Sequence, residues 1–360
     1  MRAPTRKPRR MVILTEGRLN IWTAKTAVCV MRYLPEQVCC VLDSKAAGQD
    51  PEKLTGAGRG IPIVATLKEA LCFRPNTLLI GIAPVGGRLP EAWRRTVLQA
   101  LAAGLDLISG LHFFLGDDPV LARAARRHRR RIWDVRRVPD DLDCSRNVAK
   151  DTRCRRILTV GSDANLGKMT VALELALEAR RRGHDAEFVA TGQTGIVIAG
   201  SGICVDRPIA DFINGAAERL VMERRRREML FIEGQGSIGH PAYSGVALGL
   251  LHGCAPDAMV LCHCPGRKMT RSVETPIAPL PLLVRLHEEL AGLVCRSKVV
   301  GVALNTWGME DAAAVEAAKD AERQTGLPAT DVFRFGCGKL MDALERHYDL
   351  IGKRKGDPCA

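Results

Sequence analysis

The sequence predicts an α/β protein with two domains, a Rossmann-like N-terminal domain and a P-loop NTPase-type, doubly wound C-terminal domain. Three features carry this prediction: a length of 360 residues, apolar strand-like runs that alternate with helical stretches, and a glycine-rich loop that follows a strand near the middle of the chain. At about 150 residues per domain, the length allows two cores. Alternating strands and helices are typical of a parallel sheet that is covered by helices on both faces.

The N-terminal domain is expected over residues 1–137. Its short apolar runs end in polar or glycine-containing turns, and we expect strands at 12–14, 38–42, 61–64, 77–80, 105–108 and 131–133. No G-x-G-x-x-G follows the first run, so the dinucleotide-binding fingerprint is absent. The order of elements is similar to that of the coenzyme A-binding domain of acyl-CoA synthetases. Residues 138–151 are polar and lack periodicity, which predicts a linker before a P-loop domain at 152–360.

Composition restricts the class of protein. Hydrophobic residues make up 46% of the chain and charged residues 26%, as in folded globular proteins. No apolar run approaches the roughly 18 to 20 residues that cross a bilayer, and the run 11–14 is too short for the core of a signal peptide. We therefore expect a cytoplasmic protein that has no membrane partner.

The cysteines and the positive charge have plain interpretations. The chain has 13 cysteines but no C-x-x-C, so we expect reduced thiols, and a zinc site at Cys262, His263 and Cys264 lacks further ligands at a suitable spacing. The net charge is +13, but the arginine runs fall in helical stretches and aromatic residues are only 4% of the chain. Both features disfavour a nucleic-acid surface. A basic surface instead suits a polyanionic small molecule such as ATP or coenzyme A.

The segment 161–170, GSDANLGKMT, has the composition of a phosphate-binding loop. Glycines at both ends allow backbone N–H groups to converge on one anion. The following helix adds its N-terminal partial positive charge, and Lys168 reaches the terminal phosphates. The residues that we expect to bind the cofactor here are Gly161, Asp163, Asn165, Gly167, Lys168, Met169 and Thr170.

Two departures from the common loop bear on its chemistry. Five residues separate Gly161 from Gly167, a spacing similar to that of dethiobiotin synthetase. Met169 follows the lysine, where a Ser or Thr hydroxyl normally ligates magnesium, and Thr170 lies about 100° further round the helix. We therefore predict phosphate binding without a resident metal. If magnesium is used, Thr170 and Glu233 are the candidate ligands.

Three residues of the C-terminal domain are candidate catalytic groups. Glu233 follows an apolar run, where a carboxylate can hold an amine, polarise a catalytic group or cap the glycine-rich turn. His240 lies in the same glycine-rich loop, and an imidazole with an ordinary pKa near 6.5 suits a general base; a binding or structural role is the alternative. Asp211, in a polar stretch between two strands, is the third candidate.

Binding residues are expected at other strand ends. Arg267 follows a buried strand-like run and can clamp a carboxylate or a phosphate, with a solvated charge cluster as the alternative. Asn305 follows another such run, at a position similar to the asparagine that meets adenine in dethiobiotin synthetase-type proteins. Gln193 and Thr194 lie in a polar loop after a third run.

Four strings together resemble the D-glutamate N-acetyltransferase family, and the resemblance spans nearly the whole chain. They are GSDANLGKMT at 161–170, ATGQTG at 190–195, EGQGS at 233–237 with His240 and Pro241, and CHCPGR at 262–267. The resemblance implies a Rossmann-like and a P-loop domain, with acetyl-CoA and an acidic D-amino acid similar to D-glutamate as substrates. A loop that holds coenzyme phosphates needs no magnesium hydroxyl, which accounts for Met169.

The resemblance also implies roles for the candidate residues. His240 or Glu233 would deprotonate the substrate ammonium so that its nitrogen can attack the thioester. Arg267, or Lys25 of the N-terminal domain, would pair with the substrate carboxylates. The residues expected on the substrate are Lys25, Gln193, Thr194 and Arg267.

Two other functions stay open. A kinase or ligase of the dethiobiotin synthetase type would use ATP with Mg²⁺, and Thr170, Asp211 and Glu233 would organise the metal. A nucleotide-binding regulator would need no catalytic residues. Met169 favours the acetyltransferase over the kinase or ligase. The expected partner is a small-molecule substrate, and a homodimer stays open because no segment indicates the oligomeric state.

Overall fold

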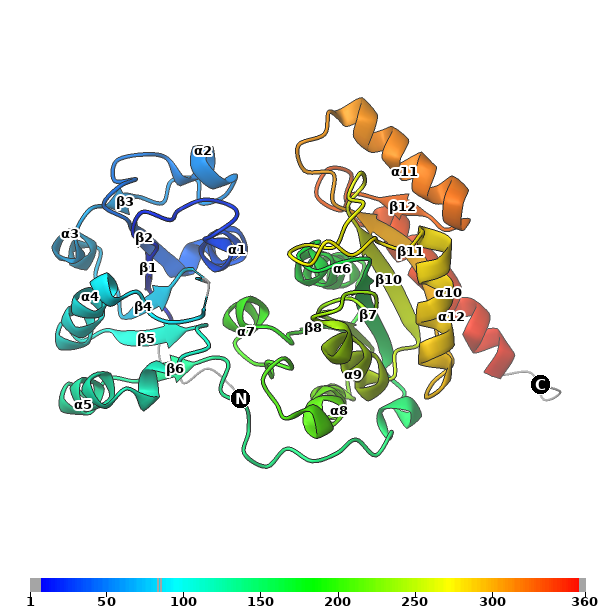
Figure 1. Ribbon diagram of the computed structural model, residues 1–360, viewed down its shortest axis with the longest axis horizontal. Helices are drawn as coiled ribbons and strands as arrows, with labels where there is room; N and C mark the ends of the chain where they lie inside the picture. The colour runs from blue at the N-terminus through cyan, green and yellow to red at the C-terminus, as the bar shows by residue number, and fades with distance from the viewer. Residues whose placement is uncertain (1–7, 83, 85, 356–360) are drawn as a thin grey trace. The chain divides into compact units, whose positions relative to one another are not determined.

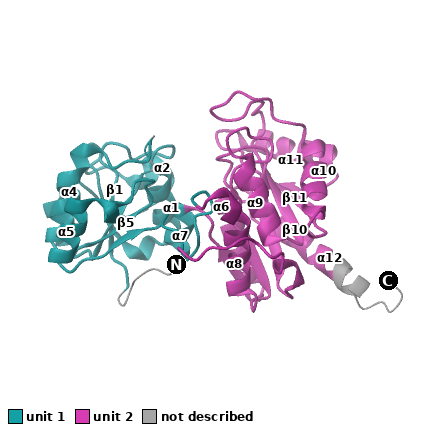
Figure 2. Cartoon of the chain, turned by 60° about the horizontal axis from the view of Figure 1, so that its bottom comes forward, with its two compact units in different colours: residues 1–139, 193–207 teal, residues 140–192, 208–360 magenta. Residues whose placement is uncertain are grey.

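The computed structural model of the chain describes residues 8–82, 84 and 86–355 (Figure 1). The chain forms two compact units: unit 1 is residues 1–139 with 193–207, and unit 2 is residues 140–192 with 208–360 (Figure 2). Each unit is built on a six-stranded sheet. The predicted α/β class is confirmed. Within the described residues, no helix combines the length and the apolar character that a membrane span requires.

Unit 1 is the Rossmann-like domain. Its strands are all parallel and follow the order β3-β2-β1-β4-β5-β6, which is the order of dinucleotide-binding folds. The strands are β1 (Met11–Leu14), β2 (Val38–Leu42), β3 (Ile63–Val64), β4 (Thr77–Ile80), β5 (Asp106–Ser109) and β6 (Ile132–Asp134). The helices are α1 (Lys25–Tyr33), α2 (Pro51–Thr55), α3 (Leu67–Cys72), α4 (Glu91–Ala102), α5 (Pro119–Arg127) and α7 (Gln193–Ala199).

Unit 2 is the P-loop domain. Its sheet is also parallel throughout, with the order β12-β11-β10-β7-β9-β8. The strands are β7 (Arg155–Gly161), β8 (Ala186–Val189), β9 (Met229–Ile232), β10 (Ala258–His263), β11 (Lys298–Leu304) and β12 (Ala329–Thr330). The helices are α6 (Lys168–Arg181), α8 (Ile213–Arg224), α9 (Ser244–Cys254), α10 (Leu280–Gly292), α11 (Asp311–Thr325) and α12 (Gly338–Lys355).

The central strand of unit 2, β7, is fixed by a buried arginine. Arg156 is 1% exposed, and its Nη2 donates to Asp257 Oδ1 at 2.6 Å, while its Nε donates to the Ala255 carbonyl at 2.7 Å. A buried guanidinium is tolerated only when its donors are paired in this way. Because Asp257 directly precedes β10, the pair locks the register of the two strands whose carboxyl ends flank the phosphate loop.

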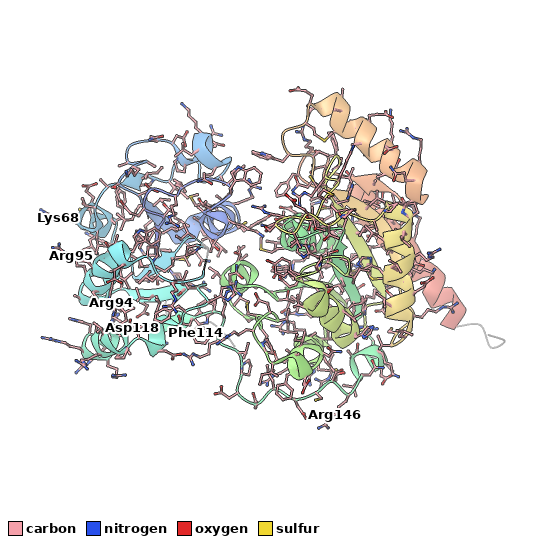
Figure 3. All side chains as sticks on the ribbon, in the orientation of Figure 1. Lys68, Arg94, Arg95, Phe114, Asp118 and Arg146 are labelled. Carbon is pink, nitrogen blue, oxygen red and sulfur yellow. The ribbon has the colours of Figure 1, made fainter. Side chains whose placement is uncertain are left out.

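The predicted linker, residues 138–151, packs for most of its length on α8 of unit 2. Glu218 of α8 accepts hydrogen bonds from the Arg146 and Val148 N–H groups, both at 2.8 Å. Arg146 is labelled in Figure 3. The chain passes so close to α8 that a Cβ on Gly215 would lie 1.7 Å from the Asp143 carbonyl oxygen. Residues 140–151 are therefore part of unit 2, next to the predicted boundary at 152.

The sequence did not predict the place of residues 193–207. This segment carries α7 and belongs to unit 1, although it lies between two strands of unit 2 in the sequence. Arg136, 5% exposed, binds it there: Nη2 donates to Gln193 Oε1 at 2.7 Å and Nη1 donates to Asp206 Oδ2 at 2.6 Å. Both predicted substrate residues of this segment, Gln193 and Thr194, are consequently residues of unit 1.

Within unit 1, α4 and α5 are joined by an ion pair. Arg94 donates to both carboxylate oxygens of Asp118, at 2.6 and 2.7 Å (Figure 3). The same carboxylate caps α5 by accepting from the Val120 and Leu121 N–H groups at 2.9 and 3.0 Å. The hydrogen bonds from Arg94 lower the pKa of Asp118 to about 2, so the pair stays charged at neutral pH.

Candidate functional site

The phosphate loop joins β7 to α6 at the carboxyl end of the sheet. Its backbone makes two left-handed turns, at Asn165 with φ of +56° and at Gly167 with φ of +100°. Gly167 is also the N-cap of α6, and no side chain caps it. The first N–H groups of a helix have no intrahelical acceptor, which makes a helix N-terminus a favourable place for an anion. The strand, loop and helix that the phosphate-binding prediction requires are present, and the binding itself stays a prediction.

Lys168 is held inside the loop. Its side chain is buried, and Nζ donates to the Asp163 carbonyl at 2.8 Å. Met169 and Thr170 are buried in the first turn of α6, at 3% and 8% exposure. A thioether in that position cannot supply the hydroxyl that normally ligates magnesium. Among the described residues, no group of three or more His, Cys, Asp or Glu side chains could hold a metal ion, and this includes the region of Cys262, His263 and Cys264.

The side chain of Asp163 is the centre of the hydrogen bonds around the loop. It is fully buried, and its Oδ2 accepts from Arg267 Nη1 at 2.8 Å and from the Arg271 N–H at 3.0 Å. Its Oδ1 accepts from the Ala164 N–H at 2.7 Å. We expected Arg267 to clamp a substrate carboxylate or a phosphate. In the structure its Nη1 is paired with a carboxylate of the loop itself, so it braces the loop after β10 against the phosphate loop.

His240 is also directed into this cluster. It is fully buried; its Nδ1 accepts from the Ala242 N–H at 3.1 Å, and its Nε2 faces the Arg271 carbonyl at 3.0 Å. Because a backbone N–H can only donate, Nδ1 carries no proton, and Nε2–H must donate to the carbonyl. Its Nε2 lies 3.7 Å from Asp163 Oδ1. Nδ1 of His240 is thus engaged by a backbone N–H, as expected for the structural role that was the alternative, and the role of His240 as general base stays a prediction.

Glu233 lies after β9, next to β7 in the sheet. Its side chain is 5% exposed, and Oε2 accepts from the Thr191 and Gly192 N–H groups at 2.9 and 3.0 Å. Thr191 Oγ1 donates to the Glu233 carbonyl at 2.6 Å. These donors fix the direction of the carboxylate. Glu233 therefore both caps the turn after β8, as the alternative interpretation had it, and presents a carboxylate one strand from the phosphate loop.

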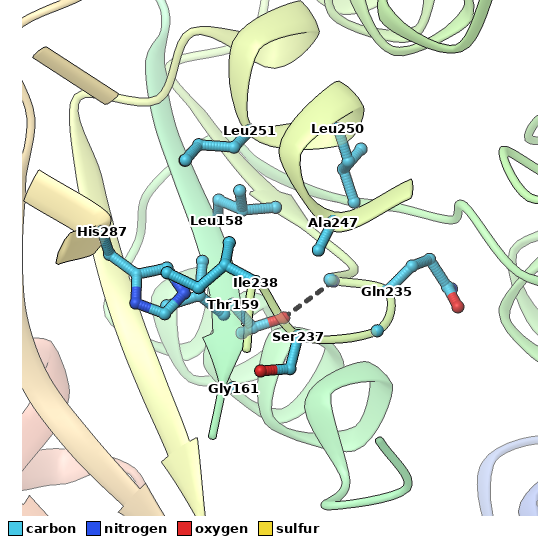
Figure 4. Close-up of a pocket in the computed structure, with 13 residues that line it drawn as sticks. Leu158, Thr159, Gly161, Gln235, Ser237, Ile238, Ala247, Leu250, Leu251 and His287 are labelled. Carbon is cyan, nitrogen blue, oxygen red and sulfur yellow. Dashed lines mark hydrogen bonds between the residues drawn. The ribbon is translucent and has the colours of Figure 1, made fainter. Parts of the chain in front are cut away.

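The contacts of Gly234, the residue after Glu233, explain why a glycine is needed in the loop after β9. The Gly234 N–H donates to Thr159 Oγ1 at 2.9 Å, the dashed line of Figure 4, and a Cβ at this position would lie 1.6 Å from the Thr159 carbonyl oxygen. Gly234 and Thr159 also line a small cavity, and Figure 4 shows the side chains around it, among them His287 and Ser237. The cavity is far too small for a coenzyme.

Side chains also connect the carboxyl ends of β10 and β11 to the phosphate loop. Ser162 Oγ lies 2.9 Å from His263 Nδ1. Burial, with a further contribution from the charge of Arg267, lowers the pKa of His263 to about 4, so its imidazole is neutral at physiological pH. Asn305 Nδ2 donates to the Leu166 carbonyl at 3.3 Å. The amide of Asn305 thus holds the loop after β11 against the phosphate loop.

The other predicted residues lie elsewhere. Lys25 is exposed at the start of α1 in unit 1. Thr194, also in unit 1, is buried with its Oγ1 2.9 Å from Thr26 Oγ1. Asp211 is exposed in the short 3₁₀ turn Ala210–Phe212, before α8. Within unit 2, the structure thus brings together the phosphate loop, Glu233, His240, Arg267 and Asn305.

Sequence reasoning missed two residues in this region of unit 2. Arg271 contributes backbone groups to both Asp163 and His240, a role that no side-chain pattern signals. Trp307, two residues after Asn305, is 64% exposed. The available signal was a tryptophan close to the end of the strand that Asn305 follows.

Comparison with known proteins follows this division of the chain. Residues 44–138 match the family described as "Domain of unknown function (DUF1611_N) Rossmann-like domain", and residues 144–341 match "Domain of unknown function (DUF1611_C) P-loop domain". The chain belongs to the DUF1611 family. Both domain types agree with the sheets described above.

Two relatives of this family have a named activity. A D-glutamate N-acetyltransferase of Tritonibacter scottomollicae is 39% identical over 329 residues, covering 90% of this chain and 95% of that protein. A D-glutamate N-acetyltransferase of a Pseudoalteromonas species is 34% identical over 278 residues, covering 77% and 83% of the two chains. The predicted family resemblance is confirmed, and the relationship supports an N-acetyltransferase enzyme.

A solved member of the DUF1611 family has the same fold. The crystal structure of a DUF1611 family protein from Anabaena variabilis, at 2.30 Å resolution, is similar with a TM-score of 0.89 at 39% identity. The match covers 94% of this chain and 99% of that one. The two-domain architecture is therefore shared along almost the whole length.

Proposed function

We propose that this DUF1611 protein transfers the acetyl group of acetyl-CoA to the amino group of an acidic D-amino acid, with D-glutamate as the first candidate. The observation that carries the proposal is a phosphate loop whose helix begins Lys168-Met169, with the Met169 side chain buried, in a chain 39% identical to a D-glutamate N-acetyltransferase. The loop has the groups that bind phosphate, and it lacks the hydroxyl that Mg-ATP chemistry ordinarily uses.

The phosphate loop binds the diphosphate or the 3′-phosphate of the coenzyme in this proposal. The first N–H groups of α6 and the ammonium of Lys168 are the donors. A phosphate oxygen takes the place of the Asp163 carbonyl as acceptor for Lys168 Nζ, 2.8 Å away in the structure. Arg267 offsets the negative charge of the Asp163 side chain, which otherwise would repel the phosphate.

The reaction requires a base for the acceptor. The substrate ammonium loses a proton, its nitrogen attacks the thioester carbonyl, the C–N bond forms and the C–S bond breaks, and the coenzyme thiolate takes up a proton. We assign the base to Glu233, since the basic nitrogen of His240 accepts the Ala242 N–H. Lys25, Gln193 and Thr194 stay predictions for the acceptor.

The test is a transfer assay that measures release of the coenzyme thiol. We expect acetyl-CoA to be consumed with D-glutamate and much more slowly with L-glutamate, without added metal and in the presence of a chelator. Glu233→Gln should lower kcat by about 10²- to 10⁴-fold, the usual range for a general base. His240→Asn, which keeps a hydrogen-bonding side chain, should lower it far less.

Two results contradict this assignment. ATP hydrolysis or ADP release that depends on Mg²⁺, with no acetyl transfer to any acidic amino acid, would replace the proposal by the kinase or ligase. A pH profile whose acidic limb, where the rate falls as the base becomes protonated, disappears in His240→Asn but persists in Glu233→Gln would return the role of base to His240.

A further inference from the structure

Three exposed aromatic side chains stand at one corner of unit 2. Trp307 is 64% exposed, Phe333 is 52% exposed and Phe335 is 46% exposed. They lie on the loops that follow β11 and β12, which are neighbours in the sheet (Figure 1). Large aromatic side chains are mostly buried in folded proteins, and aromatics grouped at the surface mark binding sites. Only 4% of this chain is aromatic, which makes the grouping more informative.

The two loops form one supported framework. Asp331, 5% exposed, accepts from Thr306 N at 2.9 Å and from Thr306 Oγ1 at 2.5 Å through its Oδ2. Its Oδ1 accepts from the Phe333 N–H at 2.9 Å. Arg334 returns from the second loop to the Thr306 carbonyl at 3.3 Å. A buried carboxylate with this many donors fixes the backbone on which the aromatic side chains stand.

This framework is connected to the phosphate loop by Asn305. Its Nδ2 donates to the Leu166 carbonyl at 3.3 Å, and its Oδ1 accepts from the Trp307 N–H at 3.2 Å. Its own N–H donates to the His263 carbonyl at 2.8 Å. The strand order places β11 two strands from β7, roughly 10 Å at about 4.8 Å per strand. A nucleoside with its phosphates in the loop can bridge such a distance.

We propose that the indole of Trp307 stacks on the adenine ring of the nucleotide whose phosphates the loop holds. The proposal rests on the proposed function for the identity of that nucleotide as coenzyme A, and it adds the residue that recognises the base. An exposed indole offers a flat π surface to a purine, and stacking of this kind needs no hydrogen bond to the base. Asn305, which we expected to meet the adenine, has its amide oxygen and nitrogen engaged by Trp307 and Leu166 and positions the platform.

The experiment is calorimetric titration of the full-length protein. The variants are Trp307→Ala, which removes the platform, and Trp307→Phe, which keeps an aromatic face. The probes are acetyl-CoA, ATP with and without Mg²⁺, and acetyl-pantetheine, which lacks the adenosine phosphates. We expect Trp307→Ala to raise the Kd of acetyl-CoA at least about tenfold, within the range for one stacked base, and Trp307→Phe to raise it less than about threefold.

Leu293→Ala is the matched control. Leu293 is 75% exposed, so the variant also removes a large exposed apolar side chain from unit 2. It lies between α10 and the start of β11, and is therefore near the amino ends of the strands, whereas Trp307 follows the carboxyl end of β11. Its Kd for acetyl-CoA should equal that of the unaltered protein. Circular dichroism of each variant shows whether it has folded.

The outcomes separate this inference from the proposed function. If ATP binds, acetyl-CoA does not, and Trp307→Ala weakens ATP, the stacking inference holds and the acetyltransferase proposal fails. If acetyl-CoA binds equally to folded Trp307→Ala and to the unaltered protein, the stacking inference is wrong and the proposed function stands. Equal weakening of acetyl-pantetheine, or no binding of acetyl-CoA and ATP by the unaltered protein, also overturns the inference.

Discussion

The two units carry the same kind of sheet but use the carboxyl ends of their central strands differently. In unit 1 the residues after β1 donate hydrogen bonds to a carboxylate of the same unit. Asp43, fully buried, accepts from Thr15 Oγ1 at 2.9 Å and from the Gly17 N–H at 2.8 Å. It also accepts from the N–H groups of Lys45 and Ala46, at 3.1 and 3.2 Å. These four donors, from the loops after β1 and β2, are thus satisfied by one internal carboxylate.

In unit 2 the loop after the central strand is built differently. After β7 the backbone passes through Gly167 into α6 with no side-chain cap, and we propose that a phosphate binds at this helix N-terminus. The carboxylate of this loop, Asp163, is paired with Arg267 and does not cap α6. The two edges thus differ in what the local carboxylate binds: Asp43 accepts from N–H groups of the loops of unit 1, whereas Asp163 of unit 2 is paired with Arg267.

The largest effect should follow from removing the lysine of the unit 2 edge. Lys168→Ala is expected to lower kcat/KM for acetyl-CoA about a thousandfold, roughly 4 kcal/mol, because a buried cation that meets a phosphate is lost. The matched control is Lys45→Ala, which removes an exposed lysine at the equivalent edge of unit 1 and should change kcat/KM by less than twofold. A comparable loss in both variants would mean that the two edges do not differ as described.

The second prediction concerns Asp43, the buried carboxylate of unit 1. Asp43→Ala leaves the three N–H groups that Oδ1 accepts without an acceptor, so the free energy of unfolding should fall by about 3 kcal/mol. Asp43→Asn keeps one acceptor oxygen and should cost about 1 kcal/mol. Urea unfolding measures both. Equal losses in the two variants would show that the carboxylate acts through its charge and not as the acceptor of these N–H groups.

The third prediction tests the brace on the phosphate loop. Arg267→Gln removes the charge that offsets Asp163, and we expect the KM for acetyl-CoA to rise about tenfold while the KM for the acceptor stays within about twofold. Lys268→Gln, an exposed neighbour, is the control for loss of one positive charge. A rise confined to the acceptor KM would restore Arg267 as the clamp on the substrate carboxylate.

The smallest effect is the pH dependence of the Arg94–Asp118 pair. Its hydrogen bonds with Arg94 lower the pKa of Asp118 to about 2, below its ordinary value of 3.8. A depressed carboxyl pKa contributes stability above the unfolded value, and that stability is lost as the pH falls from about 4 to about 2. We expect the pair to contribute about 1 kcal/mol, since Arg94 is partly exposed. Acid unfolding of Asp118→Asn should lack this component; an unchanged acid transition would exclude it.

The sequence was most informative where the structure is local. The phosphate loop, from Gly161 to Lys168, was predictable because its glycines, its lysine and the flanking strand and helix are contiguous. Glu233, Arg267 and Asn305 were placed at the correct edge, because Glu233 and Asn305 directly follow strands of one parallel sheet and Arg267 lies in the loop after a third.

Most of the remaining features depend on pairs that are distant in the sequence. The partner of Arg267 is Asp163, and His240 lies against the backbone of Arg271 as well as that of its near neighbour Ala242. The transfer of residues 193–207 to unit 1 rests on Arg136, far away in the chain. No periodicity or motif encodes such contacts, because they exist only once the sheets have formed.

The most direct test of the account is calorimetric titration of the unaltered protein with acetyl-CoA in a chelator, and separately with ATP plus Mg²⁺. The account predicts that acetyl-CoA binds without metal, that Lys168→Ala abolishes this binding, and that ATP gains little from Mg²⁺. Tight ATP binding that requires Mg²⁺, with no binding of acetyl-CoA, would contradict the claim that the unit 2 edge holds a coenzyme for acetyl transfer.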